Sequence, residues 1–311
     1  MSLVSQATAL PIVHHPAYDA PLPEEHRFPM GKFKALAQIL VAEGLAPEGF
    51  HEPTLASREA LIRAHDAAYV DAVMSQTVSP MITRRIGLPI TEAVALRARA
   101  ATGGTLLTAE LALRHGLACN TAGGSHHAAR DGGAGFCVFN DVAVAALDVL
   151  ERGGVSQILV VDLDVHQGDG TALIFADDPR VFTFSMHAEK NYPSRKPPSD
   201  LDIGLESGLE DAAYLAQLSE ALVALLERVR PELVFYVAGV DPHRDDQLGL
   251  LALSDAGLAA RERFVISACR RAGVAVACVL GGGYGRDVGV IAGRHAHLHR
   301  AASEAWAAMR P

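Results

Sequence analysis

The sequence lacks the features that would hold a protein in a membrane or stabilise it with disulfides. No stretch of about 18 apolar residues runs without a charge, and the chain does not open with a basic region followed by a long apolar run. The sequence therefore predicts neither a membrane span nor a signal peptide. Only four cysteines occur and none forms a CxxC pair, which indicates no disulfide framework. Together these absences favour a protein of the reducing cytoplasm.

Positive charge is scarce as well. The formal net charge is −9 with neutral histidines, whereas a protein that binds nucleic acid without sequence preference needs a basic face. We therefore expect no nucleic-acid partner, and the missing apolar run argues against a membrane partner. An acidic molecule instead attracts cationic partners such as lysine-rich peptides or polyamines.

Linkers, internal repeats and low-complexity segments are also missing, so we expect residues 1–311 to form a single domain. Apolar β-branched runs alternate with longer helical patterns, which predicts an α/β fold with a mainly parallel sheet and helices on both faces. The expected strands cover residues 116–120, 157–161, 180–184, 233–237 and 274–280, and the expected helices cover residues 91–114, 141–152, 209–229, 255–272 and 288–309. Sites in such sheets lie at the carboxyl ends of the strands.

The segment ILVVDLDVHQGDGT carries the strongest chemical signal. Asp162, Asp164 and His166 alternate with apolar residues, so their side chains share one side of an extended backbone and can converge. Carboxylates and imidazole suit zinc, and a catalytic zinc site uses three protein ligands and one open position. Asp241, which follows another apolar strand, is the natural third ligand. The alternative is that these aspartates cap helices or bind loop amides.

Two adjacent histidines, His126 and His127, lie in the glycine-rich segment TAGGSHHAARDGGAGFCVFND after an expected strand. Both can serve as metal ligands, or as acid–base groups that are each oriented by a carboxylate. Asp162 and Asp169 are the obvious carboxylates for the second role once Asp164 is assigned to the metal.

Tyr284 follows three glycines, residues 281–283, at the end of another expected strand. Glycines allow unusual backbone torsions and close approach to a ligand, but the spacing of known phosphate-binding loops is absent. Tyr284 is either a buried ring with a bonded hydroxyl or a donor to the oxyanion that develops in acyl transfer.

At this point the sequence resembles the histone deacetylase superfamily, which has the arginase–deacetylase fold. The motifs GGSHHA, GFCVFND, DLDVHQGDG, AGVDP and LGGGY occur in the order found in that family, and the resemblance covers nearly the whole chain. HRFPMGKF, RRIGLP, NYPSRKPPSDLDI and DDQLGLLALS look most similar to the class IV group and its bacterial homologues.

The resemblance implies zinc-dependent hydrolysis of an acyl-lysine amide in a protein or peptide. It implies that Asp164, His166 and Asp241 hold one zinc ion. His127, paired with Asp169, would be the main general base and acid. The residues implied to complete the catalytic group are His126 paired with Asp162, as an electrostatic partner, and Tyr284, which would polarise the carbonyl.

Further residues match the family's substrate channel and its potassium sites. Gly135 and Phe136 resemble the lip and one wall of the acyl-lysine channel, and Tyr192 resembles the opposite wall. The first implied potassium site comprises Asp162, Asp164, His166, Ser185 and Met186, and a weaker second site comprises Phe175, Asp178 and Val181.

Two departures from the family pattern bear on specificity. The short loop expected at residues 83–89 carries Arg84 and Arg85, and no acidic rim residue can be assigned there. Leu248 stands where polyamine-selective relatives resemble each other in having Glu, and an apolar gate does not favour a distal ammonium group. Acetylpolyamine or another small acylated amine stays an alternative substrate.

Alternatives to a one-zinc deacylase predict other residues. A binuclear manganese amidinohydrolase of the arginase branch would carry more aspartates and a DxHxD-type motif. A non-catalytic protein that binds acyl-lysine or metal would lack Tyr284 or one histidine, and all three are present. The remaining histidines of the last expected helix, His295, His297 and His299, are predicted to lie on a solvated face.

Overall fold

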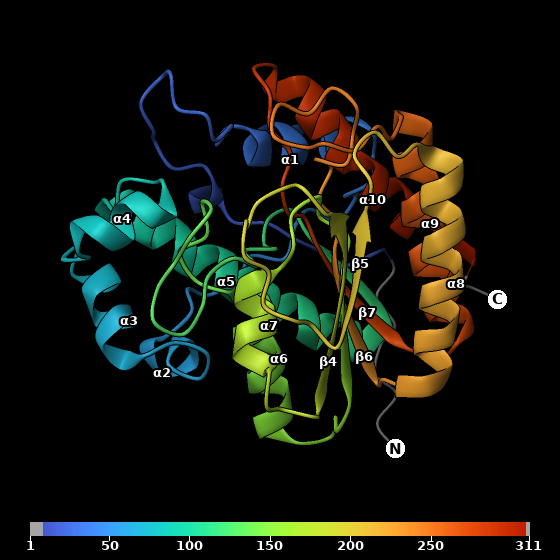
Figure 1. Cartoon of the computed structure of the whole chain (residues 1–311), viewed down its shortest axis with the longest axis horizontal. Coiled ribbons are helices and arrows are strands. Elements are labelled where there is room, and N and C mark those ends of the chain that lie inside the picture. Colours follow the sequence, from blue (N-terminus) through green and yellow to red (C-terminus); the bar gives the residue numbers. More distant parts are fainter. Residues whose placement is uncertain (1–8, 309–311) are drawn as a thin grey trace.

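Within residues 9–308, which are those that the computed structural model describes, seven strands form one sheet whose neighbours all run parallel. Their order in space is β1-β2-β7-β6-β3-β4-β5 (Figure 1). The strands are β1 (Ile12–Val13), β2 (Leu117–Asn120), β3 (Ile158–Asp162), β4 (Val181–Ala188), β5 (Leu201–Leu205), β6 (Leu233–Val237) and β7 (Ala275–Val279). This arrangement confirms the parallel sheet expected from the sequence.

Helices cover both faces of the sheet, as the alternation of patterns predicted. One face carries α5 (Glu92–His115), α6 (Asp141–Arg152) and α7 (Asp169–Phe175), and the other carries α1 (Lys32–Ala42), α8 (Asp211–Val229), α9 (Asp255–Arg271) and α10 (Val288–Ala308) (Figure 1). The helix ends carry the expected local signals. Thr91 caps the first turn of α5 through its hydroxyl, and Gly116 ends the helix in the left-handed conformation.

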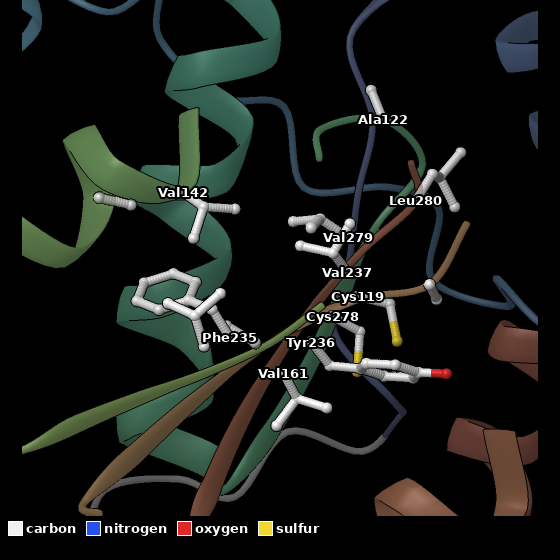
Figure 2. Packing of buried hydrophobic residues seen from close by; sticks show 14 of the residues in the cluster. Cys119, Ala122, Val142, Val161, Phe235, Tyr236, Val237, Cys278, Val279 and Leu280 are labelled. Carbon is white, nitrogen blue, oxygen red and sulfur yellow. The ribbon is translucent and has the colours of Figure 1, made fainter. Parts of the chain in front are cut away.

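The central strands are apolar on both sides because both sides are covered. Every residue of β3 and β6 is buried, which is usual in a parallel sheet between two helical layers. Alternate residues of β6 face opposite layers: Figure 2 shows Phe235 beside Val142 of α6, while Tyr236 points to the other side. The Tyr236 hydroxyl donates to Glu262 of α9, so this strand contacts both layers.

Most strands and long helices lie where the sequence predicted them. The predicted strands match β2, β3, β6 and β7 to within a residue or two, whereas β4 runs on to Ala188. The predicted long helices match α5, α6, α8, α9 and α10, and the predicted end at residue 309 lies outside the described residues. No helix among residues 9–308 is long and apolar enough to cross a membrane.

Several short elements were not predicted. They comprise the edge strands β1 and β5, helices α1 and α7, and three helices that precede α5, namely α2 (Arg58–Leu61), α3 (Ala67–Met74) and α4 (Pro80–Ile86). The segment expected as a loop at residues 83–89 is therefore mostly the end of α4. β1 has two residues and α2 has four, which is too short to show a periodic pattern. α1, with 11 residues, is long enough to show one and was missed.

The prediction for the histidines of α10 was wrong. His295 and His299 are completely buried, and only His297 is partly exposed. α10 packs between α1 and α9, so more than one side of the helix faces protein. Burial lowers the pKa of His299 to about 4 and also lowers that of His295, so both rings are neutral at pH 7.

We expect Gly103→Ala to lower the free energy of unfolding by about 1–3 kcal/mol. A Cβ at Gly103 would lie 1.9 Å from the carbonyl oxygen of Thr54, so α5 or the neighbouring backbone would have to move. Gly293→Ala is the matched control, because that helical glycine has no atom within 4 Å of the added carbon. The control should raise stability by up to about 1 kcal/mol. Urea denaturation measures both, and equal effects would contradict the close approach.

Candidate metal centre and active site

The polar motifs found in the sequence lie at the carboxyl ends of four neighbouring strands. Asp162 is the last residue of β3, and Asp241 follows β6. The paired histidines follow β2, and the glycine run follows β7. Because the strands are parallel, these ends meet at one edge of the sheet. The topology thus brings together residues that are far apart in the sequence.

Asp164, His166 and Asp241 form a buried cluster whose ligand atoms all lie within 4.8 Å of one another. Nδ1 of His166 lies 3.0 Å from Oδ1 of Asp164 and 3.2 Å from Oδ2 of Asp241. The remaining carboxylate oxygens accept backbone N–H groups, from Gly282 at 2.6 Å and from Val165 at 2.9 Å. Such outer bonds fix the orientation of metal ligands.

Burial and the neighbouring charges shift the pKa values within this cluster. Burial opposes a charged imidazole, but hydrogen bonds to both carboxylates outweigh it and raise the pKa of His166 to about 10. Burial, followed by the charge of Asp164, raises the pKa of Asp241 to about 7. The cluster therefore holds a proton between two carboxylates. Two carboxylates and one imidazole are a donor set that zinc accepts, with a fourth position free.

Asp162 lies apart from this cluster although it shares the DxDxH motif. Its Oδ2 lies 2.6 Å from Nδ1 of His126, and its Oδ1 accepts the N–H of Asp164. Nδ1 of His127 lies at the same distance, 2.6 Å, from Oδ1 of Asp169. The structure thus places each histidine of the pair beside the carboxylate that the family resemblance implied for it.

The two histidines have opposite protonation. Burial disfavours a charged His126, but Asp162 and Asp164 outweigh burial and raise its pKa to about 9. Burial, followed by the charge of His126, lowers the pKa of His127 to about 4, and the bond to Asp169 only partly offsets this. Near pH 7, His126 is therefore an imidazolium while His127 is a neutral base.

Tyr284 reaches the same site because the glycines before it pass close to the metal cluster. A Cβ on Gly282 would lie 1.9 Å from Oδ2 of Asp241, and Gly281 and Gly283 have φ angles of 113° and 150°, so no other residue fits. The ring of Tyr284 lies 6.1 Å from that of His166. Burial raises the pKa of its hydroxyl well above the usual range, which keeps the hydroxyl a donor.

The residues expected to bind substrate line one cavity of about 280 Å³, which is also lined by His127, His166 and Tyr284. Phe136 lies on one wall, with its ring 5.8 Å from that of Tyr284. The ring of Tyr192 stands nearly perpendicular to His127 at 4.9 Å. The predicted residues Gly135, Phe136, Tyr192 and Leu248 all belong to this lining.

Residues of the first expected potassium site lie on the other side of the ligand loop. Ser185 of β4 is paired with Asp162 of β3 in the parallel register. Its hydroxyl is hydrogen-bonded to Nδ1 of His187 at 2.9 Å, and Met186 is buried. The structure therefore places Ser185 and Met186 beside the end of β3, from which Asp164 and His166 follow.

Residues of the second expected potassium site share one turn. The N–H of Asp178 donates to the carbonyl of Phe175, and the N–H of Val181 donates to the carbonyl of Asp178. The carboxylate of Asp178 is already bound by the guanidinium of Arg180 at 2.6 and 2.8 Å. A cation in this turn would depend on backbone carbonyls.

Lys32 is a site residue that sequence reasoning missed. It is fully buried at the start of α1, and its Nζ donates to the carbonyls of Gly281 at 3.1 Å and Gly283 at 3.4 Å. Nζ also lies 5.7 Å from the ring centre of Tyr284. Burial lowers its pKa to about 8. Lys32 thus supports the glycine run, and no sequence signal separates it from an ordinary surface lysine.

Comparison with known families gives a match over most of the chain. The profile of the histone deacetylase domain matches residues 26–299. Histone deacetylase 2 from Arabidopsis thaliana is 31% identical to this chain, and the match covers 88% of this chain and 74% of that protein. An uncharacterized protein of a Picosynechococcus species is 54% identical over 95% of this chain and 99% of its own length.

Solved structures give the same result for the fold. The crystal structure of an HDAC homolog complexed with SAHA superposes with a TM-score of 0.81 and 25% sequence identity. The match covers 95% of this chain and 84% of that one. The parallel sheet described above is therefore the arginase–deacetylase architecture expected from the motifs.

We expect zinc to bind metal-free protein at one ion per chain and to release about one proton near pH 7.5. His166 is protonated at that pH because its pKa is raised to about 10, and a ligand imidazole must give up that proton. Calorimetric titration in two buffers of different ionisation enthalpy measures the proton count.

Asp241→Asn should weaken zinc binding by roughly 100-fold or more, since the variant loses a ligand oxygen. Asp177→Asn is a control because this residue is exposed on the surface. Two ions per chain, or binding without proton release, would contradict the assignment of the cluster.

Proposed function

The chain belongs to the histone deacetylase family, and from this premise we propose that it is a zinc-dependent deacylase of acyl-lysine in proteins or peptides. Membership of the family supports hydrolytic deacylation in general. One observation supports the finer statement most strongly. His166 of the three-residue cluster lines the substrate cavity together with His127 and Tyr284. His126 and Asp164 line a neighbouring pocket to which His127 and Tyr284 also belong.

Asp164, His166 and Asp241 would hold the zinc ion. When bound, zinc supplies Lewis-acid chemistry, since it polarises an amide carbonyl and makes a neighbouring water easier to deprotonate. The first potassium site around Ser185 and the second at residues 175–181 are proposed as structural, on the family resemblance alone.

His127 is the general base in this mechanism. Its imidazole is neutral near pH 7 because burial and the charge of His126 lower its pKa to about 4, so Nε2 can accept the proton of the attacking water. Asp169 holds the opposite ring nitrogen and stabilises the imidazolium that forms. His127 then returns the proton to the leaving amine, as acid–base catalysis requires.

Tyr284 and His126 stabilise the negative charge that develops on the carbonyl oxygen. The Tyr284 hydroxyl stays protonated because burial raises its pKa, and a fixed donor of this kind acts most strongly in the transition state. His126 remains an imidazolium because Asp162 holds its proton. One water and one amide thereby give one carboxylic acid and one amine.

The alternatives agree less well with the structure. Among residues 9–308, one cluster of three or more metal-ligating side chains occurs, whereas a binuclear manganese enzyme needs a larger set. A non-catalytic binding protein would not need both histidine–aspartate pairs and the tyrosine. An acetylpolyamine would place a distal ammonium group near Leu248, which offers no acidic partner. A single domain over residues 1–311 and a cytoplasmic location stay predictions.

The proposed function is tested with fluorogenic acyl-lysine peptides that differ in acyl group, alongside N-acetylated polyamines. Turnover of an acyl-lysine peptide should be lost with a chelator and restored by zinc. No turnover of any substrate by folded, zinc-loaded protein would contradict the deacylase function, and preferred turnover of a polyamine would select the alternative substrate.

In the same assay, Tyr284→Phe should reduce kcat about 100- to 1000-fold, because it removes one donor to the developing oxyanion. Zinc content should not change, since the tyrosine is not a ligand. Tyr214→Phe is the matched control: it removes a buried hydroxyl of α8 that lines neither the substrate cavity nor the pocket beside it. Undiminished turnover by the Tyr284 variant would contradict its role.

We expect kcat/KM to fall at alkaline pH, where His126 loses the proton that Asp162 stabilises. Asp162→Asn should move this alkaline limb to lower pH, because the charge of Asp162 stabilises the imidazolium and raises the pKa of His126. The amide oxygen of asparagine can still accept the N–H of Asp164. Profiles from about pH 6 to 11 compare the two proteins, and coincident limbs would exclude His126 as the titrating group.

A further inference from the structure

The mouth of the substrate channel carries two arginines and no acidic side chain. We define the mouth by the cavity-lining residues Arg27, Arg85, Asn191, Tyr192 and Leu248. No aspartate or glutamate belongs to the described lining of the cavity. The whole chain has a formal net charge of −9, so the mouth differs in sign from the molecule around it. Positive charge at the mouth of a cleft attracts anionic ligands and repels cationic ones, so it selects which ligands enter.

Arg85 is held beside the lip of the channel by its own backbone and side chain. Its Nε donates to the carbonyl of Gly133 at 2.9 Å, and its carbonyl accepts the N–H of Gly135 at 3.1 Å. Its only acidic neighbour within 4 Å among the described residues is Asp131, at 3.8 Å. The Asp131 side chain is 72% exposed, and an exposed pair at that distance neutralises little charge.

Arg27 is exposed, but the backbone on both sides of it is anchored. Nε2 of His26 lies 2.9 Å from the carbonyl oxygen of Gly87, next to α4. The ring of Phe28 is buried and lies 5.4 Å from that of Phe136, the channel wall. Among the described residues, Arg27 makes no ion pair within 4 Å, not even with the acidic residues 24 and 25 that precede it. Its guanidinium is therefore available to a ligand at the mouth.

The rest of the mouth is neutral. Tyr192 and Leu248 lie in the same lining as the arginines, and Asn191 uses its amide within the protein, donating to the carbonyl of Leu248 and accepting the N–H of Leu250. The two guanidinium groups are thus the charged groups that an entering substrate meets first. A guanidinium pairs with a carboxylate through two parallel hydrogen bonds.

On the premise of the proposed deacylase function, we propose that this mouth selects acyl-lysine substrates that carry a carboxylate at their backbone end. Arg27 and Arg85 bind that carboxylate while the acyl amide occupies the channel. The carboxylate is either the α-carboxylate of a free or C-terminal acyl-lysine, or an acidic side chain next to the acyl-lysine in a peptide. A distal ammonium group, as in an acylated polyamine, is repelled at the same place.

Two matched substrate pairs test the proposal. One pair is Nα-acetyl-Nε-acetyl-lysine with a free α-carboxylate or with a carboxamide. The other is a short peptide amide with Glu or Gln after the acetyl-lysine. In at least one pair, kcat/KM should favour the charged member by roughly three- to tenfold, and that pair identifies the source of the carboxylate. The preference should shrink at about 0.5 M salt, because screening acts strongly on exposed charges.

Variants of the arginines connect this preference to the mouth. Arg27→Gln and Arg85→Gln should each reduce the ratio of charged to neutral turnover, and the double variant should abolish the preference. Arg85→Lys separates charge from anchoring, since it keeps the charge but loses the bond to Gly133, and should keep part of the preference. Arg84→Gln is the matched control, because Arg84 is an exposed residue of the same helix that does not line the cavity.

Equal or faster turnover of the neutral members in both pairs would overturn the proposal, and so would a preference that survives in the double variant. In both cases the neutral carboxamide is still hydrolysed, so the deacylase function stands. No turnover of any member of either pair by the unmodified, zinc-loaded protein would instead overturn the deacylase function and this inference with it.

Discussion

Negative charge buried at one edge of the sheet is the constraint on which the rest of the site depends. Asp162, Asp164 and Asp241 are all at most 2% exposed, and buried carboxylates are costly unless they are paired and hydrogen-bonded. Backbone N–H groups, two histidines and Lys32 supply part of the compensation. The proton held by the metal cluster supplies the rest. A site built in this way suits a cation, which would take the place of that proton.

A buried arginine joins the two loops that carry Asp164 and Asp241. Arg261 of α9 is fully buried and donates to the carbonyls of Leu163 at 3.0 Å and Gly239 at 2.7 Å. These carbonyls lie just before Asp164 and Asp241 in the sequence, so one side chain connects both ligand loops. Glu262 balances its charge. The positions of the ligands are thus set by the packing of a helix, in addition to the register of the strands.

Features that a local sequence pattern determines could be predicted, whereas features that depend on the packing of distant segments could not. The strands β3 and β6, the DxDxH spacing and the glycines before Tyr284 are local patterns, and parallel pairing brings their ends together without further information. Lys32 and His295 could not be predicted, because each lies in an ordinary helical segment and its burial depends on which helices pack there. Arg27 was missed for a related reason, since only the fold brings it to the channel near Arg85.

The proposed selection at the mouth and the proposed chemistry at the inner end concern different charges. An amide is neutral, whereas the amine that leaves takes up a proton, so hydrolysis creates an ammonium group inside the channel. The arginines at the mouth repel that ammonium, while a carboxylate at the other end of the same molecule is attracted to them. A substrate with a carboxylate is therefore attracted to the arginines while its amide is intact. Its product is attracted through the carboxylate and repelled through the new ammonium group. Under the proposal, a mouth of this sign binds the intact acyl-lysine more favourably than the product, which carries an ammonium group.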